Sequence, residues 1–414
     1  MKICIHRGSK EIGGTCIEIE SQGQRIILDI GIPLDCPIDE ATIPEVSGIK
    51  NHDESLLGII VSHAHLDHYG LLSAVTQDIP ILIGDGARKI INASNFFFPT
   101  NNLSLDNYNI LEDQKPISLG PFTITPYLVD HSAYDAYAVL IEANGKHLFY
   151  SGDFRGHGRK QKLLDRLIAH PPKKIDVLLM EGTTLSRVSS KTRYPSEDEL
   201  ENRFIHLIKD TKGMALIWAA AQNIDRLVTI YKACRKTNRL FIVDMYTASI
   251  MRAIENPKLP QPGWSQFKVF LPLRQKKVIR DRKLFDFAKS FSSSRVYPEQ
   301  LKVLSERAVM LFRPSMVRDL EKVDCLANAS LIYSLWPGYL KEKRLNWFND
   351  WMTKNKISLC HCHTSGHAPI FDLQRFAKAI KPDKLVPIHT FEPGLYQEYF
   401  TNVKIQNDGE WWTI

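Results

Sequence analysis

A cluster of histidines and one aspartate directly follows a short, strongly apolar run. The run Leu56–Val61 (LLGIIV) leads straight into SHAHLDH, whose four candidate metal ligands are His63, His65, Asp67 and His68. A β-branched run of this length predicts a buried strand, and open α/β sheets place their chemistry at the carboxyl ends of strands. On extended backbone the first two histidines point to the same side, while the aspartate and third histidine, at a turn, can face a second point. The motif therefore predicts metal ligands at a sheet edge, able to serve two ions.

Other candidate ligands also follow predicted strands. His131 comes after the alternating run Phe122–Val129, in a position that suits a third histidine for one zinc, although a lone histidine is more often structural. Asp153 follows a predicted hairpin around Asn144-Gly145. Two divalent ions roughly 3.5–4 Å apart need a shared anion to offset their repulsion, so Asp153 is the candidate bridging carboxylate.

Asp29 ends the apolar run that begins at Ile26 and precedes Gly31. A carboxylate there can orient a metal-binding histidine by accepting its other N–H. The alternative is an ordinary turn aspartate.

The pattern His-x-His-x-Asp-His resembles the signature of the metallo-β-lactamase superfamily. Later motifs resemble those of its nucleic-acid-processing branch, the β-CASP nucleases, and of the ribonuclease J family within it. The resemblance implies an α/β fold: a metallo-β-lactamase αββα sandwich with an inserted parallel-sheet α/β domain of the β-CASP kind. It also implies that Asp29 supports the metal site without necessarily being a ligand.

The insertion is expected to divide the chain into three stretches: residues 1–181 and 358–414 form the metallo-β-lactamase domain, and residues 182–357 form the insert. The strand that begins at Asp176 ends at Glu181, which resembles the first β-CASP motif, an acidic residue at a strand end. Within the insert, Ser196 caps a predicted helix with acidic residues in its first turn. A later helix opens near Asn223, where free N–H groups make an anion site plausible. In the family, the matching Asn-Ile turn faces the RNA backbone.

The return segment carries a second group of histidines. His363, Ser365 and His367 match the family's His-x-Ser-Gly-His-Ala, in which the serine and flanking histidines hold phosphate and the last histidine also assists catalysis. His389 ends the last predicted strand and matches the terminal motif, which implies that it ligates the second metal. A separate zinc site in Cys360-His361-Cys362-His363 is disfavoured, because neighbours on a strand point to opposite faces.

Charge is divided unevenly along the chain. The formal net charge of the whole chain is +7. Residues 182–357 hold 32 Lys+Arg against 17 Asp+Glu, a balance of +15. The rest of the chain holds 21 Lys+Arg against 29 Asp+Glu, a balance of −8. Surface lysines and arginines can serve solubility alone. A basic insert beside an acidic remainder instead favours a polyanionic partner, here RNA or single-stranded DNA.

Composition sets further expectations. No apolar stretch approaches the ~18 residues of a membrane span, and no signal peptide precedes the first predicted strand, so a cytoplasmic protein without membrane partners is expected. Seven cysteines, an odd number, fit reduced thiols better than a disulfide framework. The sequence leaves open whether the chain forms a homodimer.

The resemblance completes the expected site. One zinc would be held by His63, His65, His131 and Asp153, and a second metal, zinc with manganese or magnesium as alternatives, by Asp67, His68, Asp153 and His389. Asp67, Glu181 and His367 are the expected catalytic residues. Zinc lowers the pKa of bound water to about 7 and so supplies a nucleophile for phosphodiester hydrolysis.

Several functions remain open at this point. RNA and DNA, and endonuclease and 5′-exonuclease action, are not separated by the sequence. A small-molecule hydrolase of the thioesterase or lactonase type is a rival, although it needs neither a basic insert nor the second histidine group. An inactive nucleic-acid-binding relative is disfavoured because every expected ligand is present.

Overall fold

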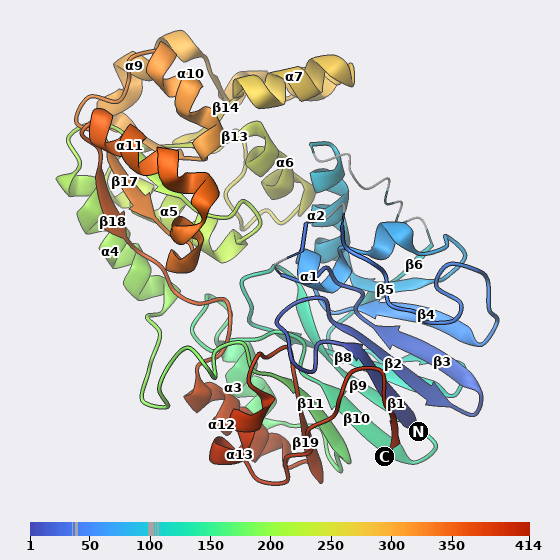
Figure 1. Cartoon of the computed structure of the whole chain (residues 1–414). Coiled ribbons are helices and arrows are strands. Elements are labelled where there is room, and N and C mark those ends of the chain that lie inside the picture. Colours follow the sequence, from blue (N-terminus) through green and yellow to red (C-terminus); the bar gives the residue numbers. More distant parts are fainter. Residues whose placement is uncertain (35, 38–39, 98–102, 104, 106) are drawn as a thin grey trace. The chain divides into compact units, whose positions relative to one another are not determined.

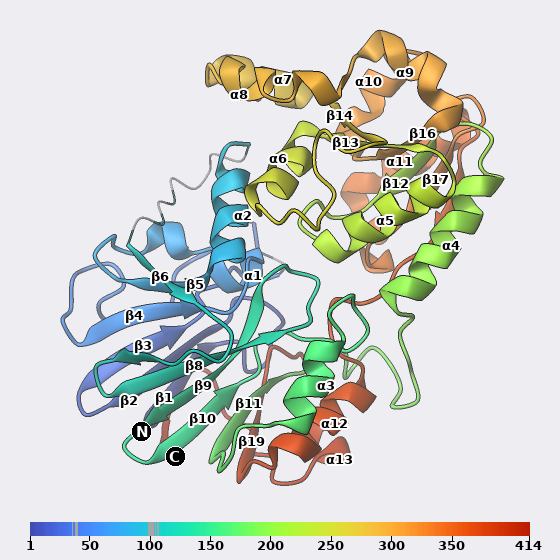
Figure 2. The same ribbon diagram turned by 180° about the vertical axis from the view of Figure 1, so that it is seen from behind.

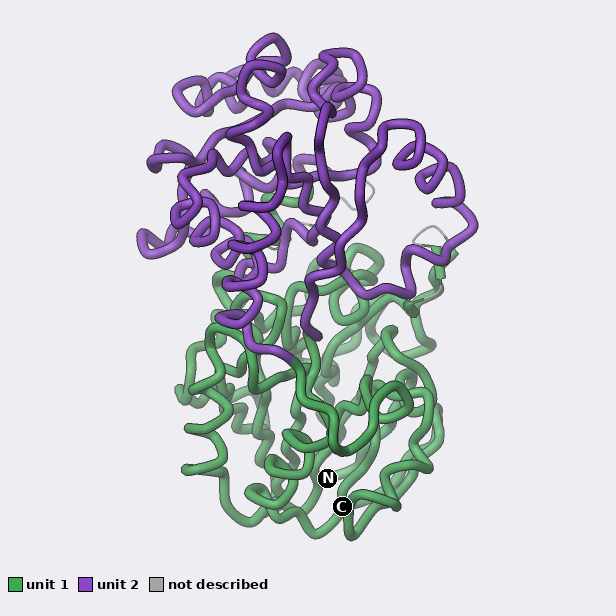
Figure 3. Tube along the Cα trace, turned by 90° about the vertical axis from the view of Figure 1, so that its left-hand side faces the viewer, with its two compact units in different colours: residues 1–95, 99–194, 366–414 green, residues 96–98, 195–365 purple. Residues whose placement is uncertain are grey.

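The computed structural model describes residues 1–414 except 35, 38–39, 98–102, 104 and 106. The chain divides into two compact units (Figure 3). The first unit comprises Met1–Asn95, Pro99–Tyr194 and Gly366–Ile414, and the second comprises Phe96–Phe98 and Pro195–Ser365. These divisions come later along the chain than the expected ones at 181/182 and 357/358.

One sheet of the first unit contains the strand that precedes the histidine motif. Among the described residues its strand order is β20-β1-β2-β3-β4-β5-β6. The strands are β1 (Lys2–Arg7), β2 (Cys16–Ser21), β3 (Gln24–Leu28), β4 (Leu56–Val61), β5 (Ile81–Gly84), β6 (Tyr108–Leu111) and β20 (Trp411–Thr413). β20 to β3 pair in antiparallel fashion and β3 to β6 in parallel. The alternating runs of the first 35 residues predict a meander of strands. This meander and the strand expected before His63 are both confirmed.

The second sheet of this unit has the order β19-β11-β10-β9-β8-β7 within the described part of the chain. Its strands are β7 (Ile117–Leu119), β8 (Phe122–Val129), β9 (Ala136–Ala143), β10 (Lys146–Tyr150), β11 (Val177–Glu181) and β19 (Lys384–Ile388). β7 to β10 are antiparallel, whereas β10, β11 and β19 are parallel. The expected hairpin is present, because Ala143 pairs with Lys146 across Asn144-Gly145.

The two sheets of the first unit pack face to face, with helices on their outer sides (Figures 1 and 2). Buried side chains of both sheets form one core between them, including Ile17, Ile60, Val139, Leu179 and Val386. Helices α3 (Lys162–Ala169) and α12 (Ile370–Ile380) cover the second sheet, and α2 (Asp85–Asn95) contacts β5 of the first. The short α1 (Leu66–Tyr69) and α13 (Tyr396–Tyr399) and two 3₁₀ turns (Leu72–Ala74 and Pro393–Leu395) complete the unit. The expected αββα sandwich is confirmed.

The second unit is built on one parallel sheet, ordered β15-β14-β13-β16-β12-β17-β18 among the residues described. Its strands are β12 (Ala215–Trp218), β13 (Leu240–Asp244), β14 (Phe267–Phe270), β15 (Arg295–Val296), β16 (Ala308–Leu311), β17 (Ser330–Tyr333) and β18 (Ser358–His361). The parallel-sheet insert expected from the sequence is confirmed, but β12 and β13 are not neighbours. β16 lies between them and pairs with both.

Helices connect these strands. They are α4 (Glu197–Asp210), α5 (Ile224–Lys236), α6 (Met245–Ala253), α7 (Leu273–Asp281), α8 (Phe285–Lys289), α9 (Pro298–Leu304), α10 (Val317–Lys322) and α11 (Asn346–Lys354), with 3₁₀ turns at Ser292–Ser294, Ser305–Arg307, Pro314–Met316, Pro337–Lys341 and Lys343–Leu345. The expected start of α4 is confirmed: the Ser196 hydroxyl accepts from Glu199 N at 3.2 Å, and the Glu199 carboxylate accepts from Ser196 N at 2.7 Å. This reciprocal pair is a capping box.

Three local expectations differ from the structure. The sequence from Gly70 to Gln77 predicts a helix. That prediction is wrong, because α1 ends at Tyr69 and only one 3₁₀ turn follows before Val75 becomes extended. The amphipathic pattern from Lys341 to Met352 predicts a helix. The observed helix starts later, since the chain runs through 3₁₀ turns until Asn346. β18 pairs with β17 of the second unit, although residue 358 was expected to begin the return to the first domain. No helix in the described ranges is both long and apolar enough to cross a membrane.

Candidate metal centre and active site

Six strands of the first unit end at the candidate site. The residues at or just beyond these ends are Asp29 (β3), the His63–His68 loop (β4), His131 (β8), Asp153 (β10), Glu181 (β11) and His389 (β19). β3 and β4 are parallel, as are β10, β11 and β19, so their carboxyl ends meet at one edge of each sheet. The sheets thereby bring together residues that lie hundreds of positions apart in sequence.

A glycine allows the histidine loop to lie flat on the loop that follows β3. A Cβ atom at Gly31 would lie 1.7 Å from the Asp67 carbonyl oxygen, so no larger residue fits there. The two loops are joined by hydrogen bonds from Ile30 N to His68 O (2.7 Å) and from Ile32 N to Leu66 O (2.9 Å). These hydrogen bonds therefore fix the backbone that carries the candidate ligands.

Three of the histidines form one potential metal-binding group. His63 Nε2 and His131 Nε2 each lie 3.2 Å from His65 Nδ1. Ligand atoms of the three residues lie within 4.8 Å of one another. This is the set expected for the first metal, apart from Asp153, whose Oδ2 is 3.7 Å from His63 Nε2.

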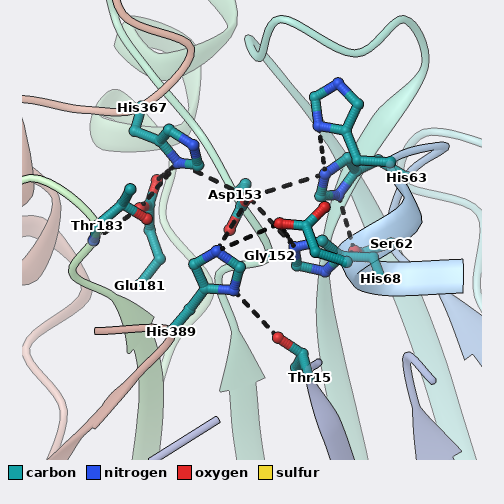
Figure 4. A network of polar contacts seen from close by, with 12 residues as sticks. Thr15, Ser62, His63, His68, Gly152, Asp153, Glu181, Thr183, His367 and His389 are labelled. Atoms are coloured by element: carbon teal, nitrogen blue, oxygen red, sulfur yellow. Dashed lines mark hydrogen bonds and ion pairs between the residues drawn. The ribbon is translucent and has the colours of Figure 1, made fainter. Parts of the chain in front are cut away.

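A second group is formed by Asp67, His68, Asp153 and His389, again within 4.8 Å. Asp153 Oδ2 lies 3.2 Å from His68 Nε2 and 3.8 Å from His389 Nε2. Asp67 Oδ2 lies 3.6 Å from His389 Nε2. Figure 4 shows Asp153 between His63 on one side and His367 and His389 on the other. Asp153 thus faces both groups.

The donor atoms of this cluster fit a divalent cation. Among the described residues, His68 Nε2, His389 Nε2 and both carboxylate oxygens of Asp153 are buried without a hydrogen-bond partner. An unsatisfied buried polar group costs about 1–3 kcal/mol, and more if it is charged. Imidazole nitrogens and carboxylate oxygens are ligands for zinc and similar ions, so a bound cation would satisfy these atoms. The cluster is therefore a candidate divalent-metal-binding site.

The surroundings of the first group favour neutral histidines, the form in which a histidine binds a metal. Burial, together with the surrounding imidazoles, lowers the pKa of His63 and of His131 well below the usual value. Burial lowers the pKa of His65 to about 4.

The second group is more strongly charged. Burial alone would lower the pKa of His68, but the carboxylates of Asp153, Asp29 and Asp67 raise it well above the usual value. Burial would raise the pKa of Asp153, but the facing imidazoles of His389, His68 and His367 hold it well below the usual value. In the absence of a cation, a proton on His68 offsets this concentration of negative charge.

Asp29 is fully buried and acts as an acceptor for four donors. Its carboxylate accepts from His68 Nδ1 (2.8 Å), Ser62 N (2.7 Å), Ser62 Oγ (2.8 Å) and the Tyr150 hydroxyl (2.5 Å). The bond to Nδ1 directs His68 Nε2 toward Asp153 and fixes its tautomer. The geometry supports the orienting role over an ordinary turn aspartate.

Sequence reasoning missed two supporting residues. Tyr150 is the last residue of β10, and its hydroxyl reaches Asp29 across the core. Thr15 Oγ1 lies 3.1 Å from His389 Nδ1, which leaves Nε2 of His389 facing the cluster (Figure 4). In the sequence, the only sign of a role for these two residues was their position beside predicted strand ends and turns.

Glu181 and His367 form a pair at the candidate metal site, where His367 itself belongs to a third potential ligand group, with His131 and Asp153. His367 Nδ1 lies 3.2 Å from Glu181 Oε2 and 3.7 Å from Asp153 Oδ2. Backbone N–H groups of Phe154 and Thr183 donate to Glu181 at 3.1 and 3.3 Å and fix the carboxylate. Burial would lower the pKa of His367, but Glu181 and Asp153 raise it to about 9.

The three expected phosphate-binding residues lie in the second unit. Asn223 caps α5, because its Oδ1 accepts from Arg226 N at 3.0 Å. His363 Nδ1 donates to Ser334 O at 3.2 Å, and burial and the charge of Arg226 lower its pKa to about 3. Ser365 is the last residue of the unit. His363 is thus neutral, with Nε2 as an acceptor, and does not offer the positive charge that a phosphate attracts.

Asn223 and His363 are linked through Arg226, which is fully buried. Its guanidinium donates to Ser334 O (3.1 Å) and Thr364 O (3.5 Å) and pairs with Glu197 at 3.0 Å. None of the potential metal groups among the described residues includes Cys360, His361, Cys362 or His363, in line with the low expectation for a separate zinc site.

The chain matches known proteins across this region. Residues 35–228 match the family described as "Beta-lactamase superfamily domain". Ribonuclease J of Helicobacter pylori is 28% identical over 252 residues, which cover 59% of this chain and 36% of that protein. The chain therefore aligns with little more than a third of the length of that relative.

Two further relatives match to different extents. Probable RNase MJ4 of Methanocaldococcus jannaschii is 27% identical over 52% of this chain and 53% of its own length. Ribonuclease J 2 of Streptococcus pyogenes is 21% identical over 97% of this chain and 71% of its own length.

A solved structure shares the whole fold. The crystal structure of a protein of unknown function from Enterococcus faecalis V583 superimposes with a TM-score of 0.78 at 21% identity and covers 100% of this chain and 99% of that chain. Together with the histidine motif, the two-sheet sandwich and the parallel-sheet insert, these matches show that residues 35–228 resemble a β-lactamase superfamily domain and that the chain is similar to ribonuclease J.

Proposed function

We propose that the chain is a metal-dependent ribonuclease that hydrolyses RNA phosphodiesters. The observation that carries the proposal is the position of Asp153, whose carboxylate faces two adjacent groups of potential metal ligands. The relatives named ribonuclease J and probable RNase support the choice of RNA over a small-molecule substrate. Because the Helicobacter pylori protein is matched over only part of its length, its activity is transferred here as a proposal.

The proposed site holds two ions. His63, His65, His131 and Asp153 would hold one zinc, and Asp67, His68, Asp153 and His389 a second metal, for which manganese and magnesium are alternatives. When bound, such ions lower the pKa of water to about 7 and stabilise negative charge on phosphoryl oxygens.

The protein's own residues divide the remaining work. His367 is placed to give a proton to the leaving oxygen, since its imidazole is protonated at neutral pH in the metal-free site. Cations bound beside Asp153 would bring that pKa closer to neutrality. Glu181 acts on His367 as a positioning residue, and it is itself held by two backbone N–H groups.

The two aspartates of the second group have different surroundings. The Asp67 side chain is 21% exposed, whereas that of Asp153 is 1% exposed. Asp67 would therefore be the more solvent-accessible of the two carboxylates that could hold an ion there, and Asp153 the buried one.

The second unit would supply most of the binding to the RNA strand. Its excess of Lys and Arg suits a polyanion, and single-stranded DNA is the closest alternative ligand. Ser365 and Asn223 would contact phosphate oxygens with their hydroxyl and amide N–H groups. His363, which is neutral, would accept a hydrogen bond from a ribose hydroxyl.

The test is incubation of zinc-loaded protein with end-labelled single-stranded RNA and DNA that carry either a 5′-monophosphate or a 5′-hydroxyl. RNA cleavage that disappears with a chelator and returns with added metal is expected, and ladders or internal cuts separate exonuclease from endonuclease action. Thioester and lactone substrates serve as matched controls. Hydrolysis of these compounds without RNA cleavage would overturn the proposal, and DNA cleavage alone would reassign the substrate.

A further inference from the structure

Two exposed aromatic side chains stand at the carboxyl end of a strand in the second unit. Trp336 and Tyr339 follow β17 and are 45% and 39% exposed. Their ring centroids lie 5.4 Å apart, with an interplanar angle of 86°. We refer to these two side chains as the aromatic platform.

The ring of Trp336 is held in place from one side. A Cβ atom at Gly338 would lie 2.0 Å from the Trp336 ring, so the indole packs directly on the glycine backbone. The buried Tyr333 donates from its hydroxyl to Trp336 O at 3.3 Å and anchors the main chain. A ring fixed in this way loses little conformational freedom when it contacts a ligand, which favours binding.

The backbone beside the platform is bonded to the segment that carries the expected phosphate-binding residues. His361 Nε2 donates to Leu335 O at 3.2 Å, and His363 Nδ1 donates to Ser334 O at 3.2 Å. His361 also stacks on Tyr333, with ring centroids 5.9 Å apart. The platform thus lies next to the strand that leads to His363 and Ser365, within the same unit.

Positively charged residues follow the aromatic residues in the chain. Lys341 and Lys343 follow directly in the chain, are exposed, and form no ion pair with any described residue. Glu342, the one acidic residue between them, is paired with Arg344. Exposed aromatic rings beside unpaired cations are the arrangement by which proteins bind single-stranded nucleic acid, with stacked bases and neutralised phosphates.

We propose that Trp336, flanked by Tyr339, stacks on an unpaired base of the RNA strand whose phosphates contact the His363–Ser365 segment. This inference rests on the proposed function and extends it. Binding through the base face means that the platform selects single-stranded over paired RNA but discriminates little among the four bases. A protein partner is disfavoured, because the lysines beside the rings call for a polyanion.

Equilibrium binding tests the contact. Zinc-loaded protein is titrated into a labelled single-stranded RNA whose phosphorothioate linkages slow cleavage, and affinity is read by fluorescence anisotropy. Trp336→Ala should weaken binding by roughly 5- to 150-fold, the range for the loss of one stacked base, and Trp336→Phe should restore most of it. The matched control is Trp264→Ala, because Trp264 is 38% exposed but precedes β14, at the opposite edge of the parallel sheet. This control should bind like the wild type.

RNAs with a single abasic ribose locate the base. In the wild type, one abasic position should reproduce the loss caused by Trp336→Ala, and the two changes combined should cost no more than either alone. Equal RNA affinities for Trp336→Ala and Trp264→Ala would overturn the proposal. So would a result in which the loss from the abasic ribose adds to the loss from Trp336→Ala at every abasic position.

The same titration separates the platform from the proposed activity. If RNA binding depends on Trp336 but the protein cleaves no RNA, the stacking proposal stands and the proposed ribonuclease activity is rejected. If Trp336→Ala cleaves RNA and binds it with wild-type affinity, the proposed activity stands and the stacking proposal is rejected. No binding of RNA by the wild type would reject both.

Discussion

Asp29 holds His68 in place: the Nδ1 atom of the histidine lies 2.8 Å from Oδ2 of the aspartate. Asp29 has a positive φ of 55°, immediately after β3, and this turn directs its carboxylate toward the β4 loop. Four donors converge on that carboxylate, so the position of His68 Nε2 is determined by a rigid network rather than by its own loop.

Replacement of Asp29 with Asn should weaken metal binding while the fold is retained. The amide cannot accept all four hydrogen bonds, so His68 loses its fixed tautomer and orientation. Loss of such a supporting partner typically lowers metal affinity about 10- to 100-fold. Competition with a chromophoric chelator measures this affinity directly, without reliance on activity.

Asp135 provides a matched control for this variant. It also has a positive φ (62°), and its carboxylate accepts from Gly86 N at 2.7 Å, but it belongs to neither metal-binding group. Asp135→Asn should bind metal like the wild type. If the two variants lose affinity equally, Asp29 contributes general stability and not orientation.

Metal analysis should return about two ions per chain. A carboxylate that faces both ligand groups, as Asp153 does, has little use with a single ion. His65→Ala should lose at least one ion and abolish RNA cleavage, since His65 Nδ1 lies between the other two histidines of its group. His52→Ala, an exposed histidine on a loop, is the control. One ion in the gently purified wild type, or near-normal cleavage by His65→Ala, would contradict the two-ion site.

The metal cluster was predictable because its signals are local. Each expected ligand stands at the end of a short apolar run, and the two-sheet sandwich brings these ends together. Tyr150 lacked such a signal, since its hydroxyl contacts a carboxylate 121 residues away in the sequence. Nothing in the sequence distinguishes it from any other tyrosine that faces the core. His363 was expected to hold phosphate, and its neutral state depends on burial and on Arg226, neither of which a motif reveals.

The order of the strands in the second unit also could not be predicted from the sequence. Its described strands are all short, and β12, β13 and β16 are all mostly apolar, so nothing in sequence places β16 between β12 and β13. The expected domain boundary near residue 358 differs from the division after Ser365 for a related reason. The continuous run of histidines and cysteines conceals the point where β18, bonded to β17, gives way to the first unit.

Glu197→Gln should destabilise the second unit. Glu197 and Arg226 are 1% and 0% exposed, and their pair joins α4 to α5 and to the carbonyls of Ser334 and Thr364. Removing one member of a buried pair leaves the other charge uncompensated, at a cost of about 3–5 kcal/mol in the free energy of unfolding. Urea unfolding followed by tryptophan fluorescence suits the measurement, because five of the seven tryptophans lie between residues 195 and 365.

Glu299→Gln is the comparison for that experiment. Glu299 is exposed in the first turn of α9 and makes no ion pair with a described residue, so its loss should change stability by under about 0.5 kcal/mol. Similar midpoints for the two variants would mean that the buried pair contributes little.

RNA affinity should fall as salt concentration rises. Each phosphate contact releases counterions, with a slope of about −0.7 per contact on a double-logarithmic plot for single strands. Three contacts would lower affinity more than tenfold between 50 and 200 mM salt. The double variant Lys341→Gln/Lys343→Gln should flatten this slope, whereas Lys162→Gln/Lys173→Gln, which removes two exposed lysines of the first unit, should not. A flat wild-type dependence would mean that the basic second unit serves solubility alone.

Ser365→Ala should alter the choice of RNA end. If Ser365 and His363 form a pocket for a terminal phosphate, binding there sets the register of the first scissile bond, and a 5′-monophosphate is preferred over a 5′-hydroxyl. Loss of one hydroxyl donor to a charged partner is worth roughly 1.5–3 kcal/mol, or about ten- to a hundredfold in rate on monophosphorylated ends. Internal cleavage should suffer less.

The rates need matched 5′-monophosphate and 5′-hydroxyl RNAs, each tested on the wild type, on Ser365→Ala and on Ser358→Ala. Ser358 is exposed at the start of β18, on the same segment, and lies outside the expected pocket, so its loss should leave both rates unchanged. A fall confined to the monophosphorylated RNA in Ser365→Ala would place the end-reading group at this serine. Equal slowing of both substrates would mean that the segment contacts the backbone at any position, and an endonuclease would then be the better account of the protein.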